Sequence, residues 1–324
     1  MLISDTLIYI TNSNSNSVSI ISDKSQKVVK TIKNVGNDPA GIAFSPDGRK
    51  AFVANFLDNN VAVIDTKSNT VIQKIDGFSG PVYISIGSVL QEDHRYRTLA
   101  FVTNFNDSSV GVIDVINHQL LEHKKIPVAP NPNGSALSPD GSTLYVACSN
   151  ENSDRLPGFV SVVDTSINME SNRITAGVFP ILVDTNGTRT YTTLNLQSSV
   201  AFITSSQNVI NINQGIGNDP IGVRFNPAVE NELYVGYGTT SKNPNISKPA
   251  IAIIKAQTVV DGFDLTAGRP EDIAFTKDGK RAYIPNSIRN SVYVIDTVKR
   301  TELRTIPVGK FPRGVAVLSP TYCP

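Results

Sequence analysis

A recurring proline sets the period of this sequence. In seven places a proline begins a short apolar segment, and consecutive prolines lie 40 to 51 residues apart. The seven are Pro39, Pro81, Pro132, Pro180, Pro220, Pro270 and Pro312. A period of this length is the signature of a repeat architecture, in which a unit buries its hydrophobic face only by stacking on its neighbours. The structure of one unit therefore decides the fold of the whole chain.

The stretch from Asp38 to Ile75 shows what one unit contains. Four short segments rich in valine, isoleucine and alanine are separated by polar turns, at 40–45, 50–54, 61–64 and 70–75. The first turn is SPDG (45–48), in which proline pre-sets φ and glycine accepts the left-handed conformation. Segments of this kind predict antiparallel hairpins. Four strands in each 40- to 50-residue unit indicate a β-propeller, and seven prolines predict seven blades.

The two ends of the chain each hold an incomplete unit. The N-terminal unit supplies second, third and fourth strands at Leu7–Thr11, Val18–Ile21 and Lys27–Ile32, but no first strand. The C-terminal unit supplies only a first strand, Pro312–Leu318. Pairing the two would complete a blade and protect its sheet edges. We therefore expect an all-β protein, a single domain over 1–324, folded as a seven-bladed β-propeller of four-stranded antiparallel blades closed by the C-terminal strand.

Two motifs recur in matching strands. Second strands read AFVAN (51–55), AFVTN (100–104) or AYIPN (282–286), and third strands read VAVIDT (61–66) or VYVIDT (292–297). In these motifs the chain resembles the YVTN family of β-propeller repeats, seen in archaeal surface-layer proteins and many exported bacterial proteins. The resemblance covers nearly the whole chain and implies a scaffold rather than a particular reaction. It implies an extracellular, periplasmic or cell-surface location. The start MLISDTLIYIT does not read as a signal peptide, and a cytoplasmic location stays open.

Composition argues against several classes of partner and cofactor. The net charge is +1 and basic residues are scattered, so no strong field attracts nucleic acid or a membrane surface. Apolar runs have the length of strands, so we expect no membrane insertion. Tryptophan is absent, which argues against the Trp-Asp propeller class. Haem, Walker and dinucleotide motifs are absent, so we expect no cofactor. Whether Cys148 pairs with Cys323 depends on the tail folding back, and the sequence leaves this open.

The residue after each proline is expected to face the mouth of the central channel. Around the ring these residues are Ala40, Val82, Asn133, Ile181, Ile221, Glu271 and Arg313. A metal-dependent propeller hydrolase or lactonase needs three or four Asp, Glu, Asn or His ligands converging on the axis. This ring offers only Asn133 and Glu271. It counts against a calcium-lactonase mechanism, and we predict neither metal ligands nor catalytic residues.

Chain direction assigns the long loops to faces of the ring. Loops before first strands share one face with the turns between second and third strands. The insertions 149–158 and 237–249 belong to these loops and are expected around the mouth, where such scaffolds carry function. A third insertion, Gly87–Thr98, belongs to the opposite face.

Charged and amide side chains flank the prolines mainly where the sixth, seventh and closing blades meet. They give six candidate ligand-binding residues: Asp38, Asn133, Asp219, Arg269, Glu271 and Arg313. One interpretation is a clamp for an anion or carboxylate, with Arg269 and Arg313 as donors. The other is a set of ion pairs between blades, such as Glu271–Arg313.

Repeated polar residues have a structural interpretation beside a functional one. The asparagines that follow second strands could form a polar ring for a ligand or could bond the local backbone in turns: Asn12, Asn55, Asn104 and Asn286. The aspartates that end third strands are interpreted as turn residues: Asp65, Asp114, Asp164 and Asp296. His118 and His123 are spaced to point to opposite faces of a strand, and His94 lies on the far-face insertion, so we expect no shared metal.

Two functions fit these observations. The first is a non-catalytic scaffold or binding module, exported or at the cell surface, that offers its mouth face to a protein, a glycan or a small ligand. The alternative is a lactonase-, lyase- or isomerase-like enzyme at the mouth, with Glu271 or Asp38 as base and Arg269 and Arg313 as anchors. Single-stranded DNA binding, as in one bacterial YVTN protein, needs stacked aromatics in a groove. Aromatics here occupy strand positions, so no nucleic-acid partner is expected.

Overall fold

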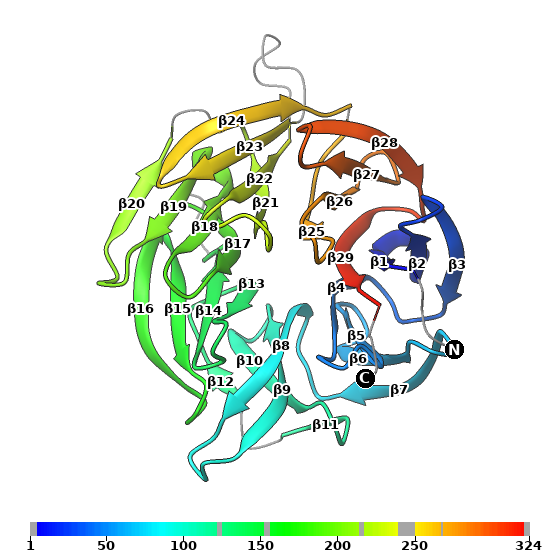
Figure 1. Cartoon of the computed structure of the whole chain (residues 1–324). Helices are drawn as coiled ribbons and strands as arrows, with labels where there is room; N and C mark the ends of the chain where they lie inside the picture. The colour runs from blue at the N-terminus through cyan, green and yellow to red at the C-terminus, as the bar shows by residue number, and fades with distance from the viewer. Residues whose placement is uncertain are drawn as a thin grey trace.

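The computed structural model describes residues 5–121, 125–151, 156–213, 217–238, 250–266 and 268–320. These residues form seven antiparallel sheets arranged as blades around a central axis (Figure 1). We number the blades 1 to 7 along the chain, beginning with the blade that contains the N-terminal strands. The expected fold class, a seven-bladed propeller with four-stranded blades, is confirmed.

The innermost strand of each blade lines the channel. In blades 1 to 7 these strands are β29 (Pro312–Leu318), β4 (Pro39–Phe44), β8 (Pro81–Leu90), β13 (Pro132–Leu137), β17 (Pro180–Thr185), β21 (Pro220–Phe225) and β25 (Ala274–Phe275). The second strands are β1 (Leu7–Asn12), β5 (Lys50–Asn55), β9 (Tyr96–Asn104), β14 (Thr143–Cys148), β18 (Thr190–Leu194), β22 (Leu233–Tyr237) and β26 (Arg281–Asn286). In blade 7 the proline precedes the strand, and Pro270 pairs with Asn286 through an isolated bridge.

Two further layers complete each blade. The third strands are β2 (Ser17–Ser22), β6 (Asn60–Asp65), β10 (Ser109–Asp114), β15 (Gly158–Asp164), β19 (Ser199–Ile203), β23 (Ala250–Lys255) and β27 (Ser291–Asp296). The outermost are β3 (Lys27–Lys33), β7 (Thr70–Asp76), the short pieces β11 (Gln119–Leu120) and β12 (Ile126–Pro127), β16 (Met169–Gly177), β20 (Val209–Ile212), β24 (Thr258–Asp264) and β28 (Thr301–Pro307). The 3-10 turns η1 (Ser13–Ser15) and η2 (Asn195–Gln197) join second to third strands. Within the described residues, no helix has the length and hydrophobicity needed to cross a bilayer.

Blade 1 joins the two ends of the chain, as the incomplete end units predicted. β29 pairs antiparallel with β1, with Leu7 opposite Leu318 and Ile10 opposite Val315. β1 continues through β2 to β3. Val315 and Leu318 are buried, so the closing strand contributes to the core as well as to the ladder.

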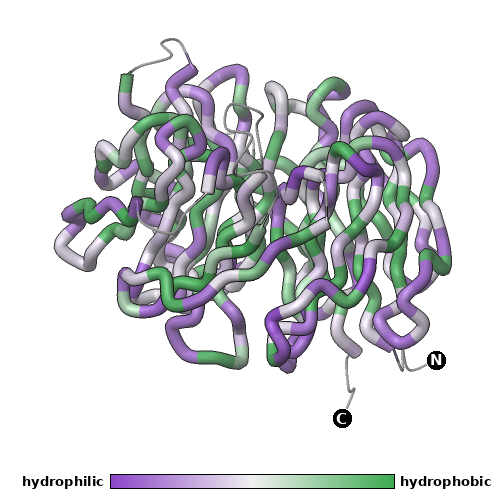
Figure 2. The backbone as a smooth tube through the Cα atoms, turned by 90° about the horizontal axis from the view of Figure 1, so that it is seen from above, coloured by the Kyte–Doolittle hydropathy of each residue, from purple (hydrophilic) through white to green (hydrophobic). Residues whose placement is uncertain are grey.

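Hydrophobic side chains between adjacent blades form the core. Phe52 and Val63 of blade 2, for example, lie in one cluster with Ile84 and Val102 of blade 3. Second and third strands are buried along almost their whole length, whereas the outermost strands are mostly exposed. Figure 2 views the ring from its edge, with many hydrophilic residues in the turns at the two faces. The faces therefore carry the polar chemistry, and the blade walls provide rigidity.

The structure describes one of the three insertions completely and the other two in part. Gly87–Thr98 is mostly strand, because β8 continues to Leu90 and β9 begins at Tyr96, so this insertion lengthens a hairpin. The parts of the other two at 152–155 and 239–249 lie outside the described residues. His123 and Cys323 also lie outside them, so the pairing of Cys148 with Cys323 stays open. Cys148 itself is fully buried.

Candidate functional site

A β-bulge follows the proline in the innermost strands. In blade 2, Pro39 pairs with Asn55 but Ile42 pairs with Val53, so the first strand carries one extra residue. The same shift occurs in blades 1, 3, 4, 5 and 6. Bulges re-aim side chains and are frequent beside functional sites. All seven post-proline residues line one recess of about 60 Å³ at the mouth of the channel, so their predicted placement is confirmed.

Buried threonines of the second strands fix this bulged backbone. Thr11 Oγ1 donates to the carbonyl of Ala40 in the next blade (2.5 Å) and accepts from the N–H of Gly314 in its own blade (2.8 Å). Thr103 and Thr193 make the equivalent bonds in blades 3 and 5. The mouth is therefore preorganised by bonds that cross blade boundaries.

The residues before the prolines have a backbone role. Six of these seven residues, all within the described part, have positive φ: Asp38, Gly80, Asn131, Phe179, Asp219 and Phe311. In every blade the carbonyl of the pre-proline residue accepts a hydrogen bond from the turn after the second strand, as Asp38 does from Phe56 (3.0 Å) and Arg269 from Ser287 (3.2 Å). Asp and Asn tolerate positive φ better than most residues. This geometry accounts for Asp38 and Asp219, neither of which lines the recess.

Replacing Asp38 by valine is expected to lower the free energy of unfolding by about 1–2 kcal/mol, because a β-branched residue is strained in the left-handed region. Asp38→Asn should stay within about 0.5 kcal/mol of wild type, because asparagine tolerates that region. Urea denaturation of both variants measures the difference. Equal losses would instead assign the effect to the carboxylate, which lies 3.9 Å from Arg313.

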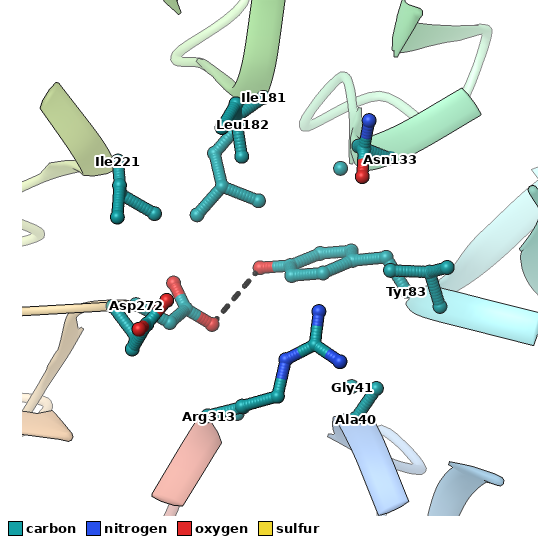
Figure 3. A pocket seen from close by; sticks show the side chains of 13 residues that line it. Ala40, Gly41, Tyr83, Asn133, Ile181, Leu182, Ile221, Asp272 and Arg313 are labelled. Carbon is teal, nitrogen blue, oxygen red and sulfur yellow. Dashed lines mark hydrogen bonds between the residues drawn. The ribbon is translucent and has the colours of Figure 1, made fainter. Parts of the chain in front are cut away.

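The second residues after the prolines form the next ring below the mouth, and Tyr83 and Asp272 narrow the channel there to a waist. In four blades this residue is a glycine: Gly41, Gly134, Gly222 and Gly314. Adjacent strands approach too closely there for a side chain, since a Cβ on Gly314 would lie 2.3 Å from the Ala40 carbonyl oxygen. In the other three blades the residue is Tyr83, Leu182 or Asp272. Figure 3 shows Tyr83 reaching across the recess to Asp272.

A hydrogen-bonded ionic cluster spans this waist. The Tyr83 hydroxyl donates to Asp272 Oδ2 (3.2 Å) and so joins blades 3 and 7 across the axis. Arg224 of blade 6 donates through Nη2 to Tyr83 and to Asp272 Oδ1 (3.0 Å), and through Nε to the carbonyl of Ile273 (3.1 Å). Asp184 of blade 5 lies 3.5 Å from Arg224 Nη1. Burial raises the pKa of Asp184, against the opposing charge of Arg224. None of these four side chains is among the six candidate ligand-binding residues predicted from the sequence.

Glu271 and Arg313 line the wall of the mouth recess, above Asp272 of the ionic cluster. Glu271 accepts from the Ser287 hydroxyl (2.6 Å) and lies 3.6 Å from Arg269 Nε. Burial raises the pKa of Glu271, and the nearby charges of Arg269 and Arg313 oppose the rise. The predicted ion pair between Glu271 and Arg313 is wrong, because each residue pairs with a different partner. Glu271 pairs with Arg269, two residues away in the same blade, and Arg313 pairs with Asp38 across the boundary between blades 1 and 2.

The two remaining candidates lie in different surroundings. Asn133 lines the recess, and its amide donates to the Ser149 hydroxyl (3.0 Å) and to the carbonyl of Asn131 (3.3 Å). Asp219 lies outside the recess, and its Oδ2 is buried without a hydrogen-bond partner among the described residues. The structure thus brings Asn133, Glu271 and Arg313 to one recess and leaves Asp38, Asp219 and Arg269 beside it. Their role in ligand binding stays a prediction.

The repeated asparagines and aspartates hold turns. Asn104 is fully buried, accepts from the Ser79 N–H (3.3 Å) and donates to the Ser109 hydroxyl (3.0 Å). Asp65 Oδ1 accepts from the backbone N–H groups of Lys67 and Ser68. Equivalent aspartate contacts occur in blades 3, 4 and 7. The turn interpretation is confirmed at these positions. In the part of the chain that the structure describes, no three His, Cys, Asp or Glu side chains are grouped to hold a metal ion.

Comparisons with solved structures show the shared fold. A functionally unknown protein from Desulfotomaculum acetoxidans DSM 771 matches with a TM-score of 0.72 at 14% identity, covering 97% of this chain and 99% of that one. A putative 6-phosphogluconolactonase from Bacteroides fragilis NCTC 9343 matches at 0.70 and 12%, covering 98% and 99%. Virginiamycin B lyase from Staphylococcus aureus matches at 0.66 and 14%, covering 85% and 87%. No family model and no curated protein matches the sequence.

Proposed function

We propose that the protein is a non-catalytic binding module that presents the mouth face of its propeller to a protein partner. The mouth face comprises the loops before the innermost strands and the turns between second and third strands. The resemblance of the repeats to YVTN propellers supports an exported or cell-surface scaffold. The fold alone does not distinguish a scaffold from an enzyme, since proteins of the same fold include two named as enzymes and one of unknown function.

The size of the mouth recess is the observation that carries the proposal. At about 60 Å³ it has room for a few water molecules or one protruding side chain. Pockets that enclose whole small molecules measure roughly 300–1,000 Å³. Tyr83 and Asp272 close the recess below, and its wall combines five apolar side chains with Asn133, Glu271 and Arg313. Such a recess suits an anchor side chain inserted by a partner at the centre of an interface.

Large apolar side chains surround this recess on the same face. Leu57, Leu196 and Ile288 are 66%, 54% and 61% exposed and lie in turns of blades 2, 5 and 7. Phe56 and Phe105 meet edge to face in blades 2 and 3, with ring centroids 6.2 Å apart. Apolar and aromatic groups around a central pocket are typical of protein-binding surfaces.

The triple variant Leu57→Ser, Leu196→Ser, Ile288→Ser is expected to weaken partner binding at least about tenfold, or about 1.4 kcal/mol. The partner is first recovered by affinity capture with the wild-type protein, and its Kd is then measured by calorimetry. The matched control is Ile116→Ser, Ile167→Ser, Val298→Ser. It removes three exposed apolar side chains from turns on the opposite face and should leave the Kd unchanged. Equal effects of the two triple variants would contradict the proposal.

An enzyme with its site at the mouth is the second candidate, and Glu271 is the observation that favours it. A carboxyl group whose pKa is raised by burial, beside two arginines, is suited to acid–base chemistry. Turnover of a lactone by the purified protein, lost in Glu271→Gln, would replace the binding proposal with this one.

A further inference from the structure

The channel widens again on the side opposite the mouth. Beyond the waist, a cavity of about 450 Å³ lies among the ends of the innermost strands, and we call it the distal vestibule. Tyr83, Asp184 and Arg224 lie at its inner end. Its walls carry large apolar side chains, among them Ile42, Phe44, Leu137, Phe225 and Phe275. The volume suits a small organic molecule, in contrast to the recess at the mouth.

The repeat is broken at two neighbouring positions of this vestibule. The fourth residue after the proline is alanine or serine in five blades: Ala43, Ser85, Ala136, Ala274 and Ala316. Blades 5 and 6 instead carry Asp184 and Arg224, which face each other across 3.5 Å. Five blades form the same strand without a charge at this position, so the fold does not require one. Departures of this kind from the residue pattern of a repeat are expected at functional or strained sites.

Buried tyrosines hold the aromatic wall from behind. Phe44 meets Tyr9 edge to face, with ring centroids 4.9 Å apart, and Phe275 meets Tyr234 at 5.1 Å. Both tyrosines are fully buried and belong to the preceding blade. Phe225 has the equivalent contact with blade 5. Side chains packed in this way resist collapse into the cavity, so the vestibule is preformed and a ligand would spend little free energy on ordering it.

The inner end of the vestibule offers a hydrogen-bond acceptor beside a donor. Asp184 Oδ2 accepts from the Phe225 N–H (2.7 Å), and Oδ1 faces Arg224 Nη1. The other nitrogens of Arg224 are committed to Ile273 and Asp272 at 3.0–3.1 Å, so its 3.5 Å contact with Asp184 is the loosest of the set. A carboxamide can donate to one of these groups and accept from the other. Two carboxylates and one guanidinium leave the cluster negative, which disfavours an anionic head group.

We propose that the distal vestibule binds a neutral small molecule with an apolar or aromatic body and a head group, such as a carboxamide, that donates to Asp184 and accepts from Arg224. The waist separates this site from the mouth recess. The proposal therefore stands or falls independently of a protein partner at the mouth.

Benzamide is the probe, and benzoate is its anionic counterpart of the same shape. Saturation-transfer NMR on the whole wild-type protein should show saturable benzamide binding with a Kd on the order of 1 mM, within the range expected for a ligand of this size. Benzoate should bind at least about tenfold more weakly, because the net negative charge of Asp184, Asp272 and Arg224 repels its carboxylate. Equal affinity for the two probes, or no saturable benzamide binding below about 10 mM, would overturn the proposal.

Filling the vestibule should remove benzamide binding without touching the ionic cluster. Ala274→Leu and Ala316→Leu each add side-chain volume at the cavity wall. Val82→Leu adds volume at the mouth recess instead and should bind benzamide as wild type does. Benzamide binding that survives both filling variants, or that is lost in Val82→Leu, would place the probe elsewhere and overturn the proposal. Melting temperatures establish that each variant folds, and if neither filling variant folds, the benzamide-to-benzoate ratio of wild type decides.

Discussion

Arg224→Met is expected to lower the free energy of unfolding by about 3–5 kcal/mol, the usual cost of removing one partner from a buried ionic cluster. Arg224 is the common cation of Asp184 and Asp272, and it also donates to Tyr83. Without it, two carboxylates stay near the channel axis with no counter-charge, and four blades lose their shared contact. Equilibrium urea denaturation of wild type and variant at pH 7 measures the effect.

The pH dependence of the same variant gives a second readout. Burial raises the pKa of Asp184 above its ordinary value, and Arg224 opposes that rise. Removing Arg224 should therefore raise the pKa further in the folded state. A folded-state pKa above the unfolded one means that the folded protein binds protons more tightly, so stability falls as pH rises through that range. The deficit of Arg224→Met should accordingly shrink as pH falls from about 7 to about 5.

The matched control is Arg97→Met. It removes an ion pair with Asp93 that is exposed on the long hairpin of blade 3, so its cost should stay below about 1 kcal/mol with little pH dependence. Replacing the cluster entirely, with Arg224→Met, Asp184→Leu and Asp272→Leu together, should recover much of the loss, because no charge is left unpaired. A loss in Arg224→Met no larger than that of Arg97→Met would contradict the role given to the cluster.

Repeat symmetry explains how much of the mouth could be predicted. Residues at the same place in each repeat must lie on one ring, so a proline and its following residue were enough to place Ala40 and Arg313, far apart in sequence, in one recess. The closing strand followed from the same logic, since β29 supplies the strand that β1 lacks. The bulge after the proline directs these residues toward the axis, and it occurs at corresponding positions in six blades.

Contacts across the axis could not be predicted in the same way. Symmetry fixes which ring a residue belongs to, but not how far its side chain reaches. Tyr83 bonds Asp272, 189 residues away, because its long side chain crosses the axis and four of the other five residues at this level are glycines with no side chain in its path. The alternation of glycine with large residues two places after the proline was present in the sequence. Its meaning depends on the distance between adjacent innermost strands, which only the structure supplies. The partners of Glu271 were missed for a similar reason, because ring position does not decide between Arg269 and Arg313.

Removing every residue beyond Phe311 is expected to abolish cooperative folding. The truncation takes away β29, which pairs with β1 along its length and buries Val315 and Leu318. The two side chains alone represent about 3–6 kcal/mol of burial, comparable with a large part of the roughly 5–15 kcal/mol by which domains are stable. The loss also exposes the edge of β1 and the side of β4 that packs on the closing strand, so aggregation should accompany it. Thermal unfolding followed by circular dichroism, together with size-exclusion chromatography, measures both effects.

A circular permutant separates the role of the strand from that of chain length. Residues 312–320 are moved ahead of residue 5 through a short flexible linker, so that blade 1 becomes continuous in sequence. The permutant has the same strand at the same place and should regain a cooperative transition close to that of the full-length protein. A scrambled version of the moved segment should not, because register places Val315 and Leu318 in the core and a changed order exposes them. A truncated chain that melts as the intact protein does would show that the ring is held by its blade-to-blade packing alone, and that the pairing of β29 with β1 is dispensable.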